Sequence, residues 1–284
     1  MALISGIGIQ QLYDLHSHSN CSDGILRPEA LLSRAKTQGV TTLALTDHDT
    51  IAGYNEAARA ASVQGIDLIP GIEFSCLWRG MGIHIVGLNF DPDHSGLVQA
   101  CQQQSEARSR RAEKIALKLA KCGFEDTLQG AARYAGSGVI GRPHFARYLV
   151  DTGAVKNHAE AFKRYLGAGK PGDVKQEWPD IATAVDWINS AGGTAVLAHP
   201  DKYNMTRTKL RAVIEEFIEA GGRAMEVVSG RQTPQLTRDM AKLAERYELW
   251  ASCGSDFHVP DQPWQELGRF SELPDLCDPV WDHW

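Results

Sequence analysis

The chain has 284 residues, of which 43% are hydrophobic and 23% are charged, a composition typical of one globular domain or of one domain that carries an insertion. Its formal net charge is −6. This charge argues against a protein that coats long nucleic acid, which would be basic, so we expect any nucleic-acid substrate to be small or held locally.

The six cysteines form no CxxC pair and no dense framework, which indicates reduced thiols in a cytosol rather than disulfides. The apolar opening MALISGIGIQ lacks a basic region, so we interpret it as a lead-in to the first strand and not as a signal peptide. No apolar run is long enough to span a bilayer. The sequence therefore predicts a cytoplasmic protein without a membrane partner.

From Leu12 onward, short apolar segments typical of strands alternate with helical segments, several of which end at a glycine. This alternation indicates a parallel sheet covered by helices, and about seven strands favour a closed barrel over an open sheet. The predicted strands cover 12–18, 40–49, 66–74, 82–90, 194–200, 224–230 and 249–258, and the predicted helices 27–39, 51–65, 182–193, 208–222 and 233–248.

The alternation is interrupted from about Asp93 to Asp180. A long polar helix is predicted at 95–123, and short, glycine-punctuated, mostly helical segments follow it. We therefore predict a discontinuous barrel domain at 1–92 and 181–284, and an inserted helical subdomain at 93–180 that caps the substrate.

Side chains that can bind metals gather at the ends of the predicted strands. His16 and His18 stand two apart on one strand, so they point the same way and can share one ion. In a parallel barrel the carboxyl ends of the strands meet at one face, where active sites lie. This convergence predicts a metal site formed by His16, His18, Asp23, His48, Glu73, His84, His199, Asp256 and His258.

Taken singly, these residues have simpler interpretations. A lone histidine such as His84 is usually a hydrogen-bonded core or surface residue, and an isolated HxH pair is a weak signal. Asp47 and Asp49 can cap the following helix, and this is the interpretation that we favour for Asp49. Only the clustering favours metal binding.

The ligand types also restrict the metal. Imidazole with carboxylate and no thiolate suits Mn²⁺, Fe²⁺ or Zn²⁺ better than Mg²⁺ or Ca²⁺. Nine ligands exceed the needs of one ion and suffice for two or three, with Glu73 as a bridge. We expect two or three divalent ions, with Mn²⁺ as the first choice and Fe²⁺ or Zn²⁺ as alternatives.

Five motifs, DLHSHS, TDHD, PGIEF, AHP and GSDFH, occur in this order within 12–90 and 194–258. The ordered set resembles the PHP (polymerase and histidinol phosphatase) superfamily of metallophosphoesterases. The resemblance implies an α/β fold, a distorted (β/α)7 TIM-like barrel, with a trinuclear metal site. It assigns His16, His18, Glu73 and Asp256 to the first ion, Glu73, His84 and His199 to the second, and His48, His258 and Asp23 to the third. Many members have a histidine in place of Asp23.

The insertion, with GRPHFARYLV at 141–150, resembles one subgroup of that superfamily, the tryptophan-operon-linked phosphoesterases. Members of this subgroup hydrolyse nucleoside 3′,5′-bisphosphates to the 5′-monophosphate, and some trim short RNA from the 5′ end. The resemblance therefore implies a phosphatase that removes the 3′-phosphate of a small nucleotide such as pAp (adenosine 3′,5′-bisphosphate).

For the reaction, we expect a metal-bridging water, held by Glu73 and Asp256, to attack phosphorus. Arg142 is the first candidate for binding phosphate, because guanidinium binds it in a bidentate manner. Lys175 and Arg231 are weaker candidates, for which a solvated surface cation is the alternative. The proton donor stays open between His144 and a metal-bound water.

Three other functions fit parts of this pattern. An amidohydrolase also uses HxH and a final aspartate, but it usually bridges its metals with a carboxylated lysine, whereas Glu73 occupies that position here. A histidinol phosphatase would apply the same chemistry to another substrate. A metal-binding accessory domain without turnover would not need the complete ligand set. The native metal, the preference between pAp and oligonucleotides, and the oligomeric state stay open.

Overall fold

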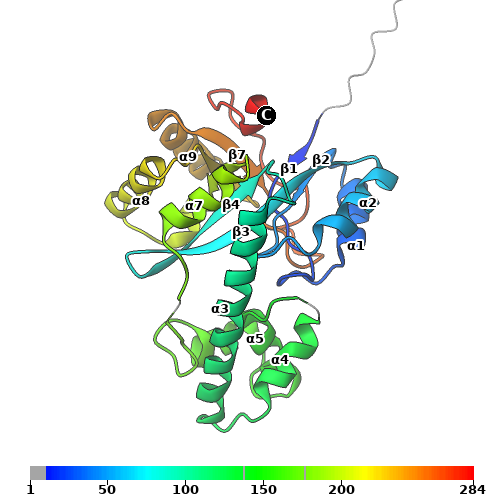
Figure 1. Cartoon of the computed structure of the whole chain (residues 1–284), viewed down its shortest axis with the longest axis vertical. Coiled ribbons are helices and arrows are strands. Elements are labelled where there is room, and N and C mark those ends of the chain that lie inside the picture. The colour runs from blue at the N-terminus through cyan, green and yellow to red at the C-terminus, as the bar shows by residue number, and fades with distance from the viewer. Residues whose placement is uncertain (1–10, 137, 176) are drawn as a thin grey trace, which may run out of the picture.

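The computed structural model describes residues 11–136, 138–175 and 177–284, so the predicted lead-in at 1–10 lies outside the described residues. Seven strands form one sheet in chain order (Figure 1). They are β1 (Tyr13–Asp14), β2 (Thr42–Leu45), β3 (Asp67–Trp78), β4 (Met81–Leu88), β5 (Thr194–Leu197), β6 (Ala224–Ser229) and β7 (Trp250–Gly254).

The first and last strands come together and nearly close the sheet into a barrel. The Leu15 N–H donates to the Cys253 carbonyl at 3.0 Å, and the His18 N–H donates to the Phe257 carbonyl at 2.9 Å. Small and branched apolar side chains fill the barrel interior, among them Leu15 and Val196. The predicted α/β barrel is therefore confirmed.

The sequence predicted a sheet that is parallel throughout, and the observed sheet is not. β4 runs antiparallel to both β3 and β5, whereas the other neighbouring pairs are parallel. Only Arg79 and Gly80 separate β3 from β4, and both have positive φ, 48° and 81°, which suits a tight hairpin turn. A parallel partner would need a crossover of about a dozen residues, so this prediction was wrong at β4.

Helices cover the outside of the sheet and pack against separate hydrophobic clusters. α1 and α2 pack over β2, and α7, α8 and α9 cover the opposite part of the barrel. Their bounds are α1 (Pro28–Thr37), α2 (Tyr54–Gln64), α7 (Ile181–Ser190), α8 (Arg207–Glu219) and α9 (Pro234–Arg246), with short helical turns η2 (Pro200–Tyr203) and η3 (Val280–His283). None of the described helices is long and apolar enough to cross a membrane.

The insertion forms a helical subdomain with a hydrophobic core of its own. α3 extends away from the barrel, and α4 and α5 lie near its far half (Figure 1). Phe145 and Leu149 of α5 pack in one cluster with Ile115 and Leu119 of α3. The elements are α3 (Ser95–Ala120), α4 (Thr127–Ala135), α5 (Arg142–Asp151), α6 (His158–Ala161) and η1 (Phe162–Leu166). The domain boundaries at residues 93 and 180 stay a prediction.

Candidate metal centre

The barrel brings the nine predicted ligands together at one end. His16 and His18 follow β1, His48 follows β2, and His199 follows β5, while His84 lies within the antiparallel β4. Four overlapping groups place one donor atom of each member within 4.8 Å of the others, and every member is buried or half-buried. These groups are His18, Asp23, His48 and His258; His16, Glu73 and His199; His16, His18 and Asp256; and His48, Glu73 and His84.

Glu73 stands at the centre of these groups. One of its oxygens, Oε2, lies 3.3 Å from Nε2 of both His16 and His18. The other, Oε1, lies 2.8 Å from His84 Nδ1 and 2.9 Å from His199 Nε2. Burial alone would raise the pKa of Glu73, but the surrounding imidazoles hold it well below its usual range. The carboxylate is therefore charged and shared between several imidazoles, as a bridging ligand would be.

Asp256 approaches two of the same imidazoles as Glu73. Its Oδ1 lies 3.6 Å from His16 Nε2 and 3.5 Å from His18 Nε2. Burial would raise the pKa of Asp256, but His16 and its other neighbours hold it well below the usual range. Two carboxylates thus approach the same pair of histidines.

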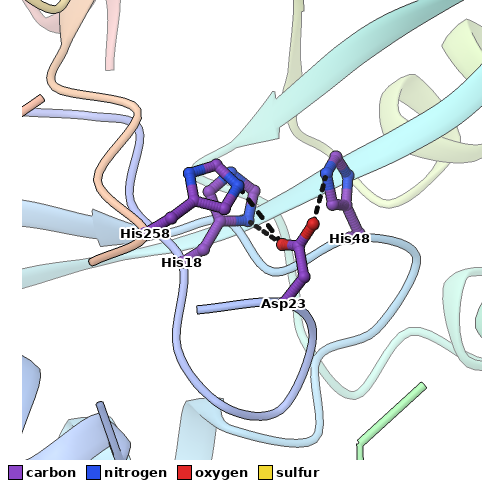
Figure 2. A group of neighbouring side chains, drawn as sticks. All are labelled: His18, Asp23, His48 and His258. Atoms are coloured by element: carbon purple, nitrogen blue, oxygen red, sulfur yellow. Dashed lines mark ion pairs between the residues drawn. The ribbon is translucent and has the colours of Figure 1, made fainter. Parts of the chain in front are cut away.

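Asp23 stands opposite three histidines (Figure 2). Its Oδ1 lies 3.2 Å from His258 Nε2 and 3.9 Å from His18 Nδ1, and its Oδ2 lies 3.8 Å from His48 Nε2. Most of these separations exceed ordinary hydrogen-bond lengths. Burial would lower the pKa of His258, but the Asp23 and Asp256 carboxylates outweigh it and raise this pKa to about 10. His18 is a member of this group, although the resemblance placed it with the first ion only.

The arrangement fits divalent cations. Asp23 Oδ1 and His48 Nδ1 are buried without a hydrogen-bond partner, although His48 Nδ1 lies only 2.9 Å from Glu73 Oε2. Buried polar atoms without partners are costly, and ions bound by the groups to which Asp23 and His48 belong would satisfy them. Imidazole nitrogens with carboxylate oxygens suit a transition-type divalent metal. The clusters therefore indicate a divalent metal centre.

Sequence reasoning missed Glu226, which orients two of the histidines. Its Oε1 lies 2.6 Å from His16 Nδ1, and its Oε2 accepts from the His199 backbone N–H at 2.6 Å. Such outer carboxylates fix the orientation of metal-binding histidines. A single acidic residue within the apolar segment AMEVVSG was the available signal.

Two more unpredicted residues complete the centre. Lys202, in η2, places its ammonium 2.7 Å from Asp256 Oδ2. Gly254 lets β1 approach β7, because a Cβ at this position would lie 2.4 Å from the Cβ of His16. No motif marked either residue, since both act through neighbours that are distant in sequence.

The predicted capping role of Asp49 is wrong. α2 begins after Gly53 and no side chain caps it. Asp49 Oδ1 instead accepts from the Ser75 backbone N–H and from Gln104 Nε2, both at 2.7 Å, and its Oδ2 accepts from Arg108 Nε at 2.6 Å. Because Gln104 and Arg108 belong to α3, buried Asp49 joins the insertion to the barrel. These partners lie 55 and 59 residues away, beyond the reach of local pattern reading.

Arg142 is half-buried at the start of α5, over the ring of Phe162 at 5.7 Å. His144 is buried two residues later, and its Nδ1 accepts from the Gly141 N–H at 3.0 Å. Burial lowers the pKa of His144, an effect that nearby Asp23 opposes. The effect of Asp23 indicates that His144 lies near the metal centre, and Arg142 precedes it in the first turn of the same helix.

Lys175 and Arg231 are placed differently. Both are exposed, and neither belongs to any of the metal-binding groups. The Arg231 backbone N–H donates to the Trp264 carbonyl at 2.7 Å, and its side chain lines a cavity of about 690 Å³ beside Arg269 and Glu266.

Arg142 has two basic neighbours that the sequence analysis did not single out. Arg108 and Arg111 stand one turn apart on α3, and their guanidinium carbons lie 5.2 and 5.8 Å from the Trp178 ring centre. Arg111 is buried and its Nε has no hydrogen-bond partner. Burial, with Arg142 and Arg108 nearby, lowers the pKa of Arg111 to about 10. We call Arg108, Arg111 and Arg142 the arginine cluster.

The arginine cluster adjoins the metal centre. Gly141, which precedes Arg142, lies close to Arg108, because a Cβ added at Gly141 would be 3.8 Å from Arg108 Nη1. Two residues earlier, the Val139 N–H donates to the Cys21 carbonyl at 3.4 Å. Cys21 lies in the loop that carries Asp23. Buried cations that repel one another are stabilised by an anion, so the cluster has the character of an anion-binding site.

Comparison with known proteins identifies the class to which this fold and site belong. The PHP domain model matches residues 14–224, and the chain belongs to this family. A 5′-3′ exoribonuclease of Haemophilus influenzae is 49% identical, over 95% of this chain and 98% of the relative. A 3′,5′-nucleoside bisphosphate phosphatase of Chromobacterium violaceum is 42% identical, over 94% of both chains.

A solved structure shows the same fold. It is that of an amidohydrolase from Chromobacterium violaceum with bound sulfate and no metal, 42% identical to this chain, and it superimposes with a TM-score of 0.90 over 95% of both chains. The predicted membership of the PHP superfamily is therefore confirmed.

Proposed function

We propose that this chain is a metal-dependent phosphoesterase that removes the 3′-phosphate of nucleoside 3′,5′-bisphosphates such as pAp, and that it also trims short RNA from the 5′ end. The relatives from Haemophilus influenzae and Chromobacterium violaceum support both activities. The observation that carries the proposal is the buried metal centre around Glu73 with the arginine cluster beside it.

Within this proposal, the nine residues of the four groups hold two or three divalent ions, with Mn²⁺ as the first choice and Fe²⁺ or Zn²⁺ as alternatives. When bound, such ions lower the pKa of a water and neutralise charge on the scissile phosphate. Glu73 and Asp256 approach the same histidine pair, so their carboxylates are placed to orient the attacking water. Glu226 holds the ring of His16 and the backbone of His199 in the positions that this requires.

The arginine cluster binds the phosphate that is not cleaved. Arg142 and Arg111 have no carboxylate within ion-pair distance among the described residues, whereas Arg108 is engaged by Asp49. Guanidinium groups bind phosphate through paired hydrogen bonds. Binding energy from this remote group can orient the scissile bond, so a substrate without it should lose turnover as well as affinity.

His144 is the protein's own candidate for the proton donor. Its Nδ1 accepts a hydrogen bond from Gly141, so the proton of the neutral ring lies on Nε2. The nearby Asp23 places this ring beside the metal centre. Lys202, beside Asp256, is a second cation that can contact the scissile phosphate.

The test is a panel of substrates with added Mn²⁺: pAp, 3′-AMP, AMP, histidinol phosphate, a short 5′-phosphorylated RNA and a simple amide. We expect kcat/KM for pAp to exceed that for either monophosphate by about 10- to 100-fold, the effect of one charged hydrogen-bonding group. Equal hydrolysis of 3′-AMP or histidinol phosphate would contradict the second phosphate site. Hydrolysis of the amide alone would indicate an amidohydrolase, and no turnover at all would indicate an accessory metal-binding domain.

A further inference from the structure

Outside the metal centre, four cations face one groove between α8 and α9. Arg207 and Arg211 stand one turn apart on α8, and Lys242 and Arg246 stand one turn apart on α9, so each pair lies on one helical face. The groove has a volume of about 360 Å³, and Leu210 and Leu243 form part of its wall. Figure 1 shows the two helices on the same flank of the barrel.

These four cations have no counter-ion among the residues at 11–136, 138–175 and 177–284. All four are exposed, and none makes a hydrogen bond or an ion pair with any residue that the structure describes. The one carboxylate that lines the groove, Asp239, accepts from Gln235 Nε2 at 2.8 Å. Some surface cations elsewhere are paired, such as Arg34 with Glu266 and Lys114 with Glu177, whereas single exposed cations such as Lys209 are not. The groove is set apart because four such cations line one surface hollow, on a chain whose net charge is −6.

The groove begins near the face of the barrel that carries the metal centre. His199 ends β5 at that centre, Lys202 contacts Asp256 from the following turn, and Arg207 opens α8. In a barrel, the helix that follows a strand starts at the same face where that strand ends. A polymer that leaves the metal centre past Lys202 thus meets Arg207 first and can continue along the groove.

We propose that the groove between α8 and α9 binds the phosphodiester backbone of a single-stranded RNA whose 5′ end lies in the metal centre. This inference rests on the exonuclease part of the proposed function. Cations that track a backbone, with apolar side chains between them for sugars and bases, are the usual features of sites that bind single strands without sequence preference. A nucleotide such as pAp, with one phosphate at the metal centre and the other at the arginine cluster, has no further phosphate for the groove.

The test compares two double variants with the same change in charge. Arg211→Glu with Lys242→Glu reverses the sign of two charges that line the groove. Lys209→Glu with Arg238→Glu changes exposed cations of the same two helices that do not line it. Binding of 5′-phosphorylated, phosphorothioate-linked strands of about 4 and about 16 nucleotides is measured by fluorescence anisotropy across a salt series, and pAp hydrolysis is measured in parallel.

We expect the groove variant to bind the longer strand about 10-fold more weakly or worse, and to reduce the slope of log affinity against log salt by about 1. The shorter strand and pAp hydrolysis should change by less than about 2-fold, and the control variant should resemble the wild type. Equal weakening in both variants, or unchanged binding of the longer strand, would overturn the inference. A wild type that hydrolyses pAp but does not bind the longer strand would also overturn it, whereas a wild type without pAp hydrolysis refutes the phosphatase proposal itself.

Discussion

The metal centre and the arginine cluster lie next to each other but are built in different ways. The metal centre takes its side chains from strands of the barrel and the loops that follow them, whose backbones are mutually hydrogen-bonded. Three residues near it, Asp49, His199 and Asp256, have positive φ, a costly conformation that persists only where surrounding structure enforces it. The arginine cluster comes from two helices of the insertion. It is held by packing on Trp178 and by the hydrogen bonds that Arg108 donates to Asp49 and Ser75.

This difference suggests a division of labour. A rigid barrel suits ligands whose positions must be reproduced within fractions of an ångström, whereas a helical insertion can carry groups that select the substrate. Changes in the barrel should therefore abolish the reaction for every substrate. Changes in the insertion should alter the choice between substrates.

The largest effect is expected from Glu73→Gln. Loss of the central carboxylate should reduce kcat for pAp and for monophosphates alike, by about 10³-fold or more, and should lower the metal content from about two or three ions per chain. Elemental analysis and kcat at saturating Mn²⁺ measure both effects, with circular dichroism as a check on the fold. His158→Gln, at an exposed histidine of α6, is the matched control and should change neither quantity. Substantial activity of the Glu73 variant would rule out the bridging role.

A smaller and more selective effect is expected from Arg142→Ala. Without this guanidinium, kcat/KM for pAp should fall by about 10- to 100-fold while that for 3′-AMP changes little, because only the bisphosphate uses the contact. Arg147→Ala, at an exposed arginine of the same helix, serves as the control. An equal loss for both substrates would show that Arg142 supports the fold or the reaction and not the second phosphate.

The smallest effect is expected from Glu226→Gln. This positioning residue touches two histidines and not the substrate, so metal affinity should fall by about 10-fold while kcat at saturating Mn²⁺ stays close to that of the wild type. A titration of activity against free Mn²⁺ separates the two quantities. Glu219→Gln, at an exposed carboxylate of α8, is the control and should change neither the metal affinity nor kcat. A lower kcat that excess Mn²⁺ does not restore would contradict a role limited to orientation.

The barrel, and the residues that it gathers in the candidate metal centre, could be predicted from the sequence because both leave local, periodic signals. Apolar strands such as 194–200 alternate with helices, and the polar residues of AHP or GSDFH occur where those strands end. The direction of β4 was missed because the inference of a parallel sheet ignored the two-residue turn at Arg79 and Gly80. The sequence alone thus determined which side chains form the candidate metal centre.

Only the tertiary structure decided how the nine side chains divide into overlapping groups, and what orients them. Glu226 reaches His16 across 210 residues, and Asp49 reaches Arg108 across 59, so neither contact leaves a local pattern. The same holds for Arg111, whose burial depends on how α3 packs on Trp178. Hydrogen bonds and burial depend on distances in space. The folded barrel and its insertion set those distances, and the separation of two residues along the chain does not reveal them.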